Sequence, residues 1–450
     1  MTTTIHIGCG AGFANDRPDA GLRLAQDLAR RSGRRYLMFE LLAERTLAEA
    51  QLRKQTDPQS GYAARLFDFL GPVLDTCIEA GVPIITNGGA ANPQAAARRL
   101  RSELGARHSD LKIACVLGDD LLGMERRHLD NWLNLDDPHA DLVSVNVYTG
   151  ADGIAQALQE GAGIVLCGRV ADPSLAVGPI RHGLGWAADD WQKMAIATAA
   201  GHLLECCTQV TGGYFAHPGI KDVPDPSRLG CPIAEISSDG TLVITKAAGS
   251  GGCVNERTVK EQLLYEVQDP RCYLTPDVVL DLGEAQVLGV GQDRVAVSGI
   301  QGHPRPDQLK GLAGVRGLWF GEAEISYAGP SAVARAGLAR EILLHRFDTL
   351  APQVRPWIDI AGVASLFNDA RGDFLEQRLA EHPELGEARV RVGLVHADRA
   401  QLETLLAEVE SLYTNGPAGG GGVRRHLGES ITTQGFLIPR DNVATQLEWY

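Results

Sequence analysis

Short apolar segments alternate with amphipathic, helix-length segments over the first 190 residues. The apolar segments have the length and composition of buried strands, and each gap between them can hold one helix. This alternation predicts βαβ units built around a parallel sheet. The predicted strands are TIHIGCG (4–10), RYLMFELL (35–42), VPIITNGGA (82–90), KIACVLGDD (112–120), DLVSVNVYTG (141–150) and AGIVLCG (162–168).

The pattern changes after residue 190. A predicted helix at 192–207 leads into a stretch rich in glycine and proline, and the segment 232–245 is typical of a β-hairpin. Strand-like and helical patterns return near the end of the chain, with a helix predicted at 399–413. We therefore expect an α/β fold with three parts: a doubly wound, mostly parallel Rossmann-like lobe (1–190), an α+β second lobe (191–349) and a small α+β C-terminal unit (350–450).

Composition narrows the class of protein. Of the 450 residues, 44% are hydrophobic and 22% are charged, which is typical of a folded globular chain. The formal net charge of −14 disfavours nucleic acid as a partner, because an acidic surface repels phosphate backbones. The sequence shows no secretory signal and no apolar run long enough for a membrane span, so we expect a cytoplasmic protein. A homo-oligomer is expected only because most soluble assemblies are of that kind.

The number and positions of the cysteines also favour a cytoplasmic protein. The chain has nine cysteines, and none of them forms a C-x-x-C pair. Several lie in apolar, strand-like segments, where a thiol behaves as a small hydrophobic group. We expect free, mostly buried thiols in a reducing environment and no zinc ribbon.

Polar and glycine residues gather where the predicted parallel strands end. In open α/β sheets, ligands bind beyond the carboxyl ends of the strands, so these residues are predicted to surround a ligand site. They are Gly8, Gly10 and Gly12; Glu40; Asn87, Gly88 and Gly89; Asp119 and Asp120; and Arg169 with Asp172.

The first glycine cluster resembles a nucleotide-binding turn only in part. Its spacing is G-x-G-x-G rather than G-x-G-x-x-G, and Glu40 follows later than the usual ribose-binding acid. A classical NAD site is therefore not expected. The cluster predicts backbone donors for some anionic or polar ligand, and the alternative is a tight turn without a ligand.

The charged residues at the other strand ends have two interpretations each. Asp119 and Asp120 have the chemistry of a metal site or an acid/base pair, or one of them caps the next helix. The guanidinium of Arg169 suits a carboxylate or phosphate, or it pairs with Asp172. Lys246 comes after a strand and before a glycine turn, which also suits an anionic group.

The segment GHLLECCTQVTGGYFAHP (201–218) is unusually rich in proton-transfer groups. Helical spacing places His202 and Glu205 on one face. These two side chains can bind a divalent metal together, or Glu205 can orient His202 as a general base. The alternative is a structural His–Glu pair that ends a helix. His217 lies in the predicted loop beyond.

Several segments, taken in order, resemble the acyclic terpene utilisation AtuA family, which is also described as a domain of unknown function. The resemblance implies a role in the breakdown of terpenes such as citronellol and geraniol, by way of branched acyl-CoA esters. One departure is His217, where the family carries an acid. The segments are GCGAGFANDR (8–17), LLAERTLA (41–48), TNGGAANP (86–93), GDDLL (118–122), GRVADPS (168–174), GHLLECCTQVTGGYFAHPG (201–219), VKEQLLYEVQDPRCYLTPDV (259–278), EISYAGP (324–330) and NGPAGGGG (415–422).

Together these observations predict a hydratase or lyase that acts on a small carboxylate or an acyl-CoA ester. Arg169 and Lys246 would hold the anionic group, and His202, supported by Glu205, would be the general base. Asp119 or Asp120 would be the acid or a metal ligand. Two alternatives remain: a nucleotide-dependent enzyme that uses the Gly8–Gly12 turn, and a non-catalytic protein that binds a metabolite in the same cleft.

Overall fold

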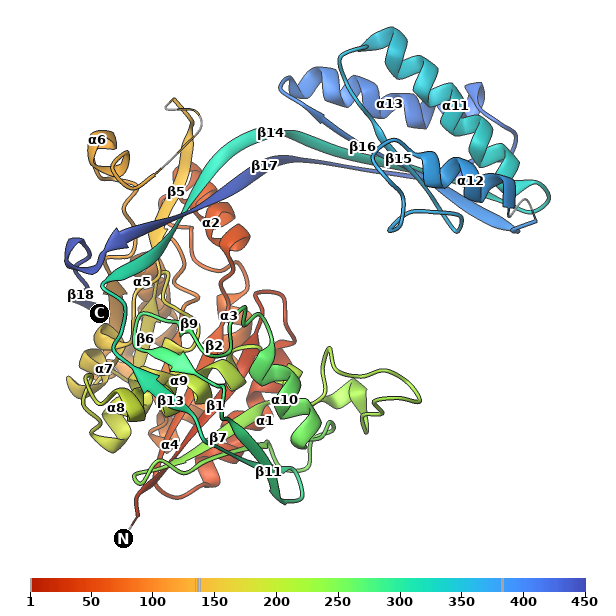
Figure 1. Ribbon diagram of the computed structural model, residues 1–450. Coiled ribbons are helices and arrows are strands. Elements are labelled where there is room, and N and C mark those ends of the chain that lie inside the picture. Colours follow the sequence, from red (N-terminus) through yellow and green to blue (C-terminus); the bar gives the residue numbers. More distant parts are fainter. Residues whose placement is uncertain (1, 134, 136, 138, 382–383) are drawn as a thin grey trace. The chain divides into compact units, whose positions relative to one another are not determined.

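The chain folds into two compact units, shown in Figure 1 for a computed structural model. The structure describes residues 2–133, 135, 137, 139–381 and 384–450. Unit 1 consists of Met1–Gly314 and Thr433–Tyr450, and unit 2 consists of Val315–Thr432. The chain therefore leaves unit 1 once and returns to it for its last residues.

A large mixed sheet forms the centre of unit 1. Five of its strands, β1, β2, β3, β6 and β4, are parallel neighbours, and antiparallel strands extend the sheet on both sides. The α/β class predicted from the sequence is confirmed at this level. The strand order is β11 (Gln286–Gly291), β12 (Arg294–Ser298), β8 (Leu242–Lys246), β7 (Pro232–Ser237), β1 (Thr4–Gly12), β2 (Arg34–Glu40), β3 (Ile84–Thr86), β6 (Ile164–Cys167), β4 (Ile113–Leu117) and β18 (Gln446–Trp449).

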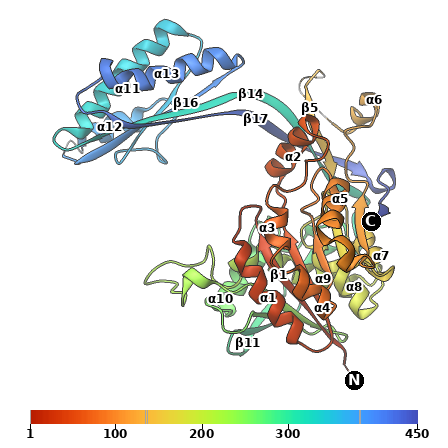
Figure 2. The same ribbon diagram turned by 180° about the vertical axis from the view of Figure 1, so that it is seen from behind.

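Helices cover both faces of this sheet (Figures 1 and 2). The central strands β3 and β6 are buried along their whole length, as expected for parallel strands with helices on either side. Their apolar sequences therefore reflect burial on two faces rather than an alternating pattern. One layer contains α1 (Pro18–Arg30), α4 (Leu74–Ala80) and α5 (Pro93–Leu104), and the other contains α7 (Asp152–Gln159), α8 (Ser174–Leu184) and α9 (Trp191–Glu205).

The predicted boundary near residue 190 falls inside unit 1. The hairpin β7–β8 pairs with β1 in antiparallel register, with Ile5 opposite Ile236, so it extends the first sheet. Helix α9 packs against β1 and β7 of the same sheet. The hairpin pattern in the sequence predicts local pairing correctly, but it carries no information about which existing strand the hairpin joins.

The remaining elements of unit 1 surround the carboxyl ends of the parallel strands or lie at the periphery. Strands β13, β10 and β9 form a small separate sheet, and β5 pairs with β14. The remaining elements of unit 1 are α2 (Glu44–Thr56), α3 (Leu66–Leu70), α6 (Arg126–Leu129), α10 (Glu256–Leu264), β5 (Leu142–Val147), β9 (Tyr273–Leu274), β10 (Val279–Asp281) and β13 (Gln301–His303). The structure shows no helix among its described residues that is long and apolar enough to cross a membrane.

Unit 2 has its own sheet and its own core. Helices α11 and α13 pack against β16, and their buried leucine, valine and alanine side chains form a cluster with those of the sheet. The chain enters this unit within β14 and leaves it within β17, so the predicted C-terminal unit begins earlier and ends earlier than residues 350–450. The elements are β14 (Gln308–Ala328), α11 (Ala332–Leu350), β15 (Trp357–Ala361), α12 (Asp373–Glu381), β16 (Glu387–His396), α13 (Arg399–Asn415) and β17 (Gly421–Pro439).

Candidate functional site

A cavity of about 480 Å³ opens in unit 1 among residues that follow β2, β5 and β6. This is the position where ligands bind in open α/β sheets. Its walls are mostly apolar, but several carboxyl groups line it as well. The lining residues are Glu44, Tyr148, Ala171, Asp172, Pro173, His202, Glu205, Glu266, Tyr273, Leu274, Thr275, Pro276, Pro306, Gln308, Leu309, Lys310 and Leu437.

His202 and Glu205 meet in the last turn of α9. Nδ1 of His202 lies 2.9 Å from Oε1 of Glu205, and Nε2 lies 3.2 Å from the carbonyl oxygen of Leu263. A carbonyl oxygen can only accept a hydrogen bond, so Nε2 carries a proton. One further proton then lies between Nδ1 and Oε1, on either the imidazole or the carboxyl group. The helical pairing predicted from the sequence is therefore present, and both ring nitrogens of His202 are in use.

The other carboxyl oxygen of Glu205 has no such partner. Oε2 is buried and makes no hydrogen bond to any described residue, and the side chain is 12% exposed. Burial raises the pKa of Glu205 to about 7, and the nearby carboxylates of Asp172 and Glu266 act in the same direction against the effect of His202. Glu205 is thus a cavity-lining group that can gain or lose a proton near neutral pH.

The pKa of His202 changes for related reasons. Burial favours the neutral imidazole, but the hydrogen bond to Glu205 and its negative charge outweigh burial and raise the pKa. Raised pKa values for both partners agree with a proton that is held tightly between them. The ring of Tyr273 packs edge-on against His202, with centroids 5.3 Å apart, and limits its movement.

Arg169 lies behind the cavity and is 1% exposed. Its Nε donates to the carbonyl of Val170 at 3.0 Å, Nη1 donates to the carbonyl of Leu42 at 2.7 Å, and Nη2 donates to the carboxylate of Asp172. The guanidinium also stacks 4.4 Å from the ring centroid of Tyr148. These contacts join the loop after β6 to the loop after β2. They also leave Arg169 outside the cavity lining.

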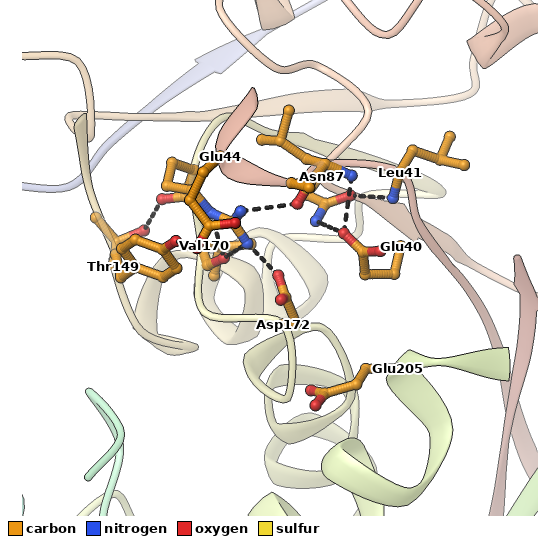
Figure 3. Close-up of polar contacts among 12 residues, drawn as sticks. Glu40, Leu41, Glu44, Asn87, Thr149, Val170, Asp172 and Glu205 are labelled. Atoms are coloured by element: carbon orange, nitrogen blue, oxygen red, sulfur yellow. Dashed lines mark hydrogen bonds and ion pairs between the residues drawn. The ribbon is translucent and has the colours of Figure 1, made fainter. Parts of the chain in front are cut away.

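Glu40 and Asn87 also connect loops, at the ends of β2 and β3 (Figure 3). Oε1 of Glu40 accepts hydrogen bonds from the Leu42 amide at 2.8 Å and from Nδ2 of Asn87 at 2.9 Å, while Oδ1 of Asn87 accepts one from the Leu41 amide at 2.7 Å. Burial, together with the charge of Asp172, raises the pKa of Glu40 well above its usual range. Both side chains hold the loops in place, and neither lines the cavity.

Asp172 and Glu44 are the other acids on the β2 and β6 side of the cavity. Burial raises the pKa of Asp172 against the opposing charge of Arg169. The pKa of Glu44 is lowered despite partial burial, because its Oε1 accepts a 2.6 Å hydrogen bond from the Tyr148 hydroxyl. Lys310 lies 3.8 Å from the same oxygen. The cavity thus combines an acid that stays ionised with two that hold protons more tightly, an arrangement suited to acid/base chemistry.

Asp119 and Asp120 lie at a different cavity of unit 1, with a volume of about 570 Å³. Oδ2 of Asp119 accepts hydrogen bonds from the Arg169 amide at 2.7 Å and from Nδ2 of Asn146 at 2.9 Å. Burial raises the pKa of Asp119 to about 6. Both oxygens of Asp120 accept hydrogen bonds, Oδ1 from the Leu122 amide and Oδ2 from Gln51. The two aspartates are not brought together with His202.

The first glycine cluster lies within strand β1 rather than in a turn, and α1 begins only at Pro18. A Cβ atom at Gly12 would lie 2.4 Å from the carbonyl carbon of Cys206 and 2.6 Å from the carbonyl oxygen of Glu205. Gly12 therefore lets the end of α9 approach the strand and place Glu205. Gly8 and Gly10 face Leu24 and Phe39 in the same close manner.

Gly88 and Gly89, the second predicted source of backbone donors, also allow close packing. A Cβ atom at Gly89 would lie 2.5 Å from the carbonyl oxygen of Cys167, and one at Gly88 would lie 2.7 Å from Leu66. Neither glycine lines the cavity that contains Glu205. Their main effect is to let the segment after β3 pass close to β6.

Lys246 and His217 lie outside both cavities. The ammonium of Lys246 donates to the Ser250 carbonyl at 2.8 Å and lies 3.4 Å from Oδ2 of Asp293. His217 is in an exposed loop that it closes through backbone hydrogen bonds with Lys221. Within the described part of the chain, no group of three or more His, Cys, Asp and Glu residues is arranged to hold a metal ion.

Some cavity residues were not singled out from the sequence. Tyr148 follows β5 in the same way as the other strand-end residues, so its position was a usable signal. Glu266 and Tyr273 lie in the segment 259–278, which carries part of the family resemblance, but no motif singled them out, and nothing in the local pattern marks Lys310.

Comparison with known proteins agrees with the resemblance seen in the sequence. No curated protein and no solved structure matches the chain. One family model, described as acyclic terpene utilisation family protein AtuA, matches residues 5–449, which is nearly the whole chain. The protein therefore belongs to the AtuA family of acyclic terpene utilisation proteins.

Proposed function

We propose that this protein is an enzyme of acyclic terpene breakdown that transfers a proton next to the carbonyl of a branched acyl compound. The observation that carries the proposal is Oε2 of Glu205, a buried oxygen of a cavity-lining residue that has no hydrogen-bond partner among the residues the structure describes. Native proteins rarely leave such an atom without a hydrogen bond, and a substrate proton is a suitable partner for it. Family membership supports the pathway, and the cavity supports the chemistry.

The roles of the side chains follow from their partners. Glu205, as the carboxylate, removes a proton from the carbon beside the carbonyl. His202 is a positioning residue, because both of its ring nitrogens are hydrogen bonded and its bond to Oε1 leaves Oε2 directed elsewhere. Asp172, whose pKa is raised, gives a proton to the departing hydroxyl, so that water leaves and a carbon–carbon double bond forms. Addition of water follows the same steps in reverse.

The walls of the cavity suit a branched hydrocarbon chain. Leu274, Leu309, Leu437, Pro173 and Pro276 line it beside the acids. Burial of methyl groups against such walls favours binding in proportion to the apolar area removed from water. The isoprenoid skeleton of acyclic terpenes carries methyl branches of this kind.

Hydrogen exchange with solvent tests the proton-transfer step by itself, separately from the rest of the reaction. The protein is incubated in D₂O with branched acyl thioesters, and deuterium at the carbon beside the carbonyl is followed by NMR. We expect incorporation with the wild type and a loss of about 10²- to 10⁴-fold in Glu205→Gln, which keeps the shape but removes the base. The matched control is Glu103→Gln, which changes an exposed glutamate on α5.

Two results would contradict the proposal. Full exchange in Glu205→Gln would remove Glu205 from the reaction. Binding of branched acyl compounds without exchange or turnover would favour a non-catalytic metabolite-binding protein.

A further inference from the structure

Another cavity of unit 1, with a volume of about 120 Å³, is lined by three arginines, Arg17, Arg23 and Arg228. Among the described lining residues, Asp19 is the one acid. This local excess of positive charge contrasts with the formal net charge of −14 of the whole chain. The cavity shares no described lining residue with the Glu205 cavity or the Asp119 cavity, so the proposed function gives it no role.

The arginine cavity lies at the edge of the sheet where the parallel strands end. Strand β7 is antiparallel to both β1 and β8, so β1 and β8 run in the same direction. The start of α1, which follows β1, and the glycine turn 247–252, which follows β8, therefore meet at one edge. Open α/β sheets bind ligands at this edge. The sequence predicted an anionic group near Lys246, and the structure places arginines rather than Lys246 beside this turn.

Backbone carbonyl groups hold two of the arginines and use only part of each guanidinium. Nη1 of Arg17 donates to the carbonyl of Ser227 at 2.9 Å, and Nη1 of Arg23 donates to the carbonyl of Gly249 at 2.9 Å. Among the described residues, neither guanidinium has an ion pair with a carboxylate, and the Nε and Nη2 atoms have no hydrogen-bond partner. Positioned guanidinium groups with available N–H donors are well suited to bind an oxyanion.

The two loops that carry these acceptors are joined closely to each other. The amide of Gly251 donates to the carbonyl of Arg228 at 2.8 Å, and the amide of Gly230 donates to the carbonyl of Gly251 at 3.1 Å. A Cβ atom at Gly230 would collide with Oγ of Ser250, so this approach requires glycine. Arg228 is held in turn by Asp225, whose Oδ2 lies 2.8 Å from its Nε. The cavity is therefore formed before a ligand arrives, which lowers the cost of binding.

We propose that this cavity binds a single phosphate group, either as the free ion or as the terminal group of a small phosphorylated metabolite. Three guanidinium groups favour a dianion over a monoanion such as a carboxylate, because each charge of the ligand adds to the attraction. The volume of about 120 Å³ is well below the roughly 300–1,000 Å³ of sites for drug-sized ligands, so it suits one oxyanion rather than a whole nucleotide. This site does not depend on the proposed proton transfer at Glu205.

Calorimetric titration of the full-length wild-type protein tests the proposal at pH 8 and constant ionic strength. The probes are inorganic phosphate, glycerol phosphate and acetate. We expect both phosphates to bind with dissociation constants below about 1 mM, and acetate to bind at least about tenfold more weakly. No binding of either phosphate, or equal binding of acetate, would overturn the proposal. Tighter binding of glycerol phosphate would identify a phosphate carried by a metabolite, and tighter binding of inorganic phosphate would identify the free ion.

Arginine variants test whether this cavity is the place of binding. Arg17→Gln and Arg23→Gln should each weaken phosphate binding by about 10- to 100-fold, because a charge-assisted hydrogen bond is lost. Arg17→Lys keeps the charge but not the planar fork, so it should weaken binding less and serves where Arg17→Gln does not fold.

The matched control is Arg45→Gln, which changes an exposed arginine on α2 that pairs with Glu49 and does not line the cavity. It removes the same charge and should alter the affinity by less than about twofold, because salt screens distant surface charges. Unchanged affinity in both Arg17→Gln and Arg23→Gln would overturn the proposal. An equal loss in Arg45→Gln would do so as well, since binding would then follow the overall charge.

Discussion

The Glu205 cavity and the Asp119 cavity of unit 1 are both lined by acids, but the carboxyl groups of the two cavities differ in their hydrogen bonds. In the cavity of Asp119, Oδ2 accepts two hydrogen bonds and both oxygens of Asp120 accept at least one. In the cavity of Glu205, one oxygen is paired with His202 and the other has no partner among the described residues. Satisfied carboxylates hold loops together, whereas an unsatisfied one is free to act on a ligand.

A raised pKa does not by itself distinguish the acid of the Glu205 cavity from the acid of the Asp119 cavity. Burial raises the pKa of Asp119 to about 6 and that of Glu205 to about 7, so both acids titrate closer to neutral pH than usual. The physical cause is the same, but the hydrogen-bond partners differ. The hydrogen-bond partners, rather than the pKa values, therefore distinguish Asp119 from Glu205.

The largest expected effect comes from exchanging one carboxyl for an amide in each cavity. Glu205→Gln should lower turnover of a branched acyl thioester by about 10²- to 10⁴-fold, because a general base is lost. Asp119→Asn should leave turnover per folded molecule within about twofold, because an amide oxygen can still accept the hydrogen bonds to Arg169 and Asn146. Steady-state kinetics on folded protein provide the measurement. Similar losses in both variants would remove the distinction between the cavities.

A substitution in β1 tests how Glu205 is placed. In Gly12→Ala, the new Cβ would meet the backbone at Glu205 and Cys206 at 2.4–2.6 Å, so the end of α9 must shift. Turnover should fall by about 10- to 100-fold, since small displacements of a reacting group are costly, and overpacking should reduce stability by about 1–3 kcal/mol. Gly123→Ala is the control, because a Cβ there meets nothing within 4 Å. Unchanged turnover in Gly12→Ala would show that this close approach does not position Glu205.

Sequence patterns predicted some features of this site well, and the physical reason is locality. The pairing of His202 with Glu205 follows from helix geometry alone, and the residues after β2 and β6 follow from the strand pattern. The pairing of Arg169 with Asp172 was one of the two interpretations that the sequence offered. Its hydrogen bond to the carbonyl of Leu42 was not predictable, because Leu42 is 127 positions away. A sequence does not distinguish a guanidinium group that binds a ligand from one that donates its hydrogen bonds to backbone carbonyl groups. The same limit applies to the β7–β8 hairpin, whose place beside β1 depends on long-range packing.

The free energy of unfolding should depend on Asp119 and its hydrogen bonds in the other cavity. Asp119→Ala leaves the Arg169 amide and the Asn146 side chain without their acceptor, which should cost about 1–3 kcal/mol. The pKa of Asp119 is higher in the folded chain, so the native state binds the proton more tightly. Its contribution to stability therefore falls as pH rises from about 4 to about 6, by about 2 kcal/mol.

Denaturant unfolding across this pH range measures that contribution, with Asp119→Asn as the matched variant. The difference in unfolding free energy between wild type and Asp119→Asn should decrease from pH 4 to pH 6. A flat difference would mean that Asp119 does not retain its proton in the folded chain.

The smallest expected effect concerns His202 and is a shift in a pH profile. Activity that needs the Glu205 carboxylate should rise with pH, with a midpoint near the raised pKa of about 7. Because the hydrogen bond and charge of His202 lower the pKa of Glu205, His202→Phe should move this midpoint to higher pH by about one unit, equivalent to about 1.4 kcal/mol. Tyr273→Phe keeps the ring against residue 202 and should leave the midpoint in place. A loss of turnover in His202→Phe as large as that expected for Glu205→Gln, at every pH, would contradict the positioning role and restore His202 as the base.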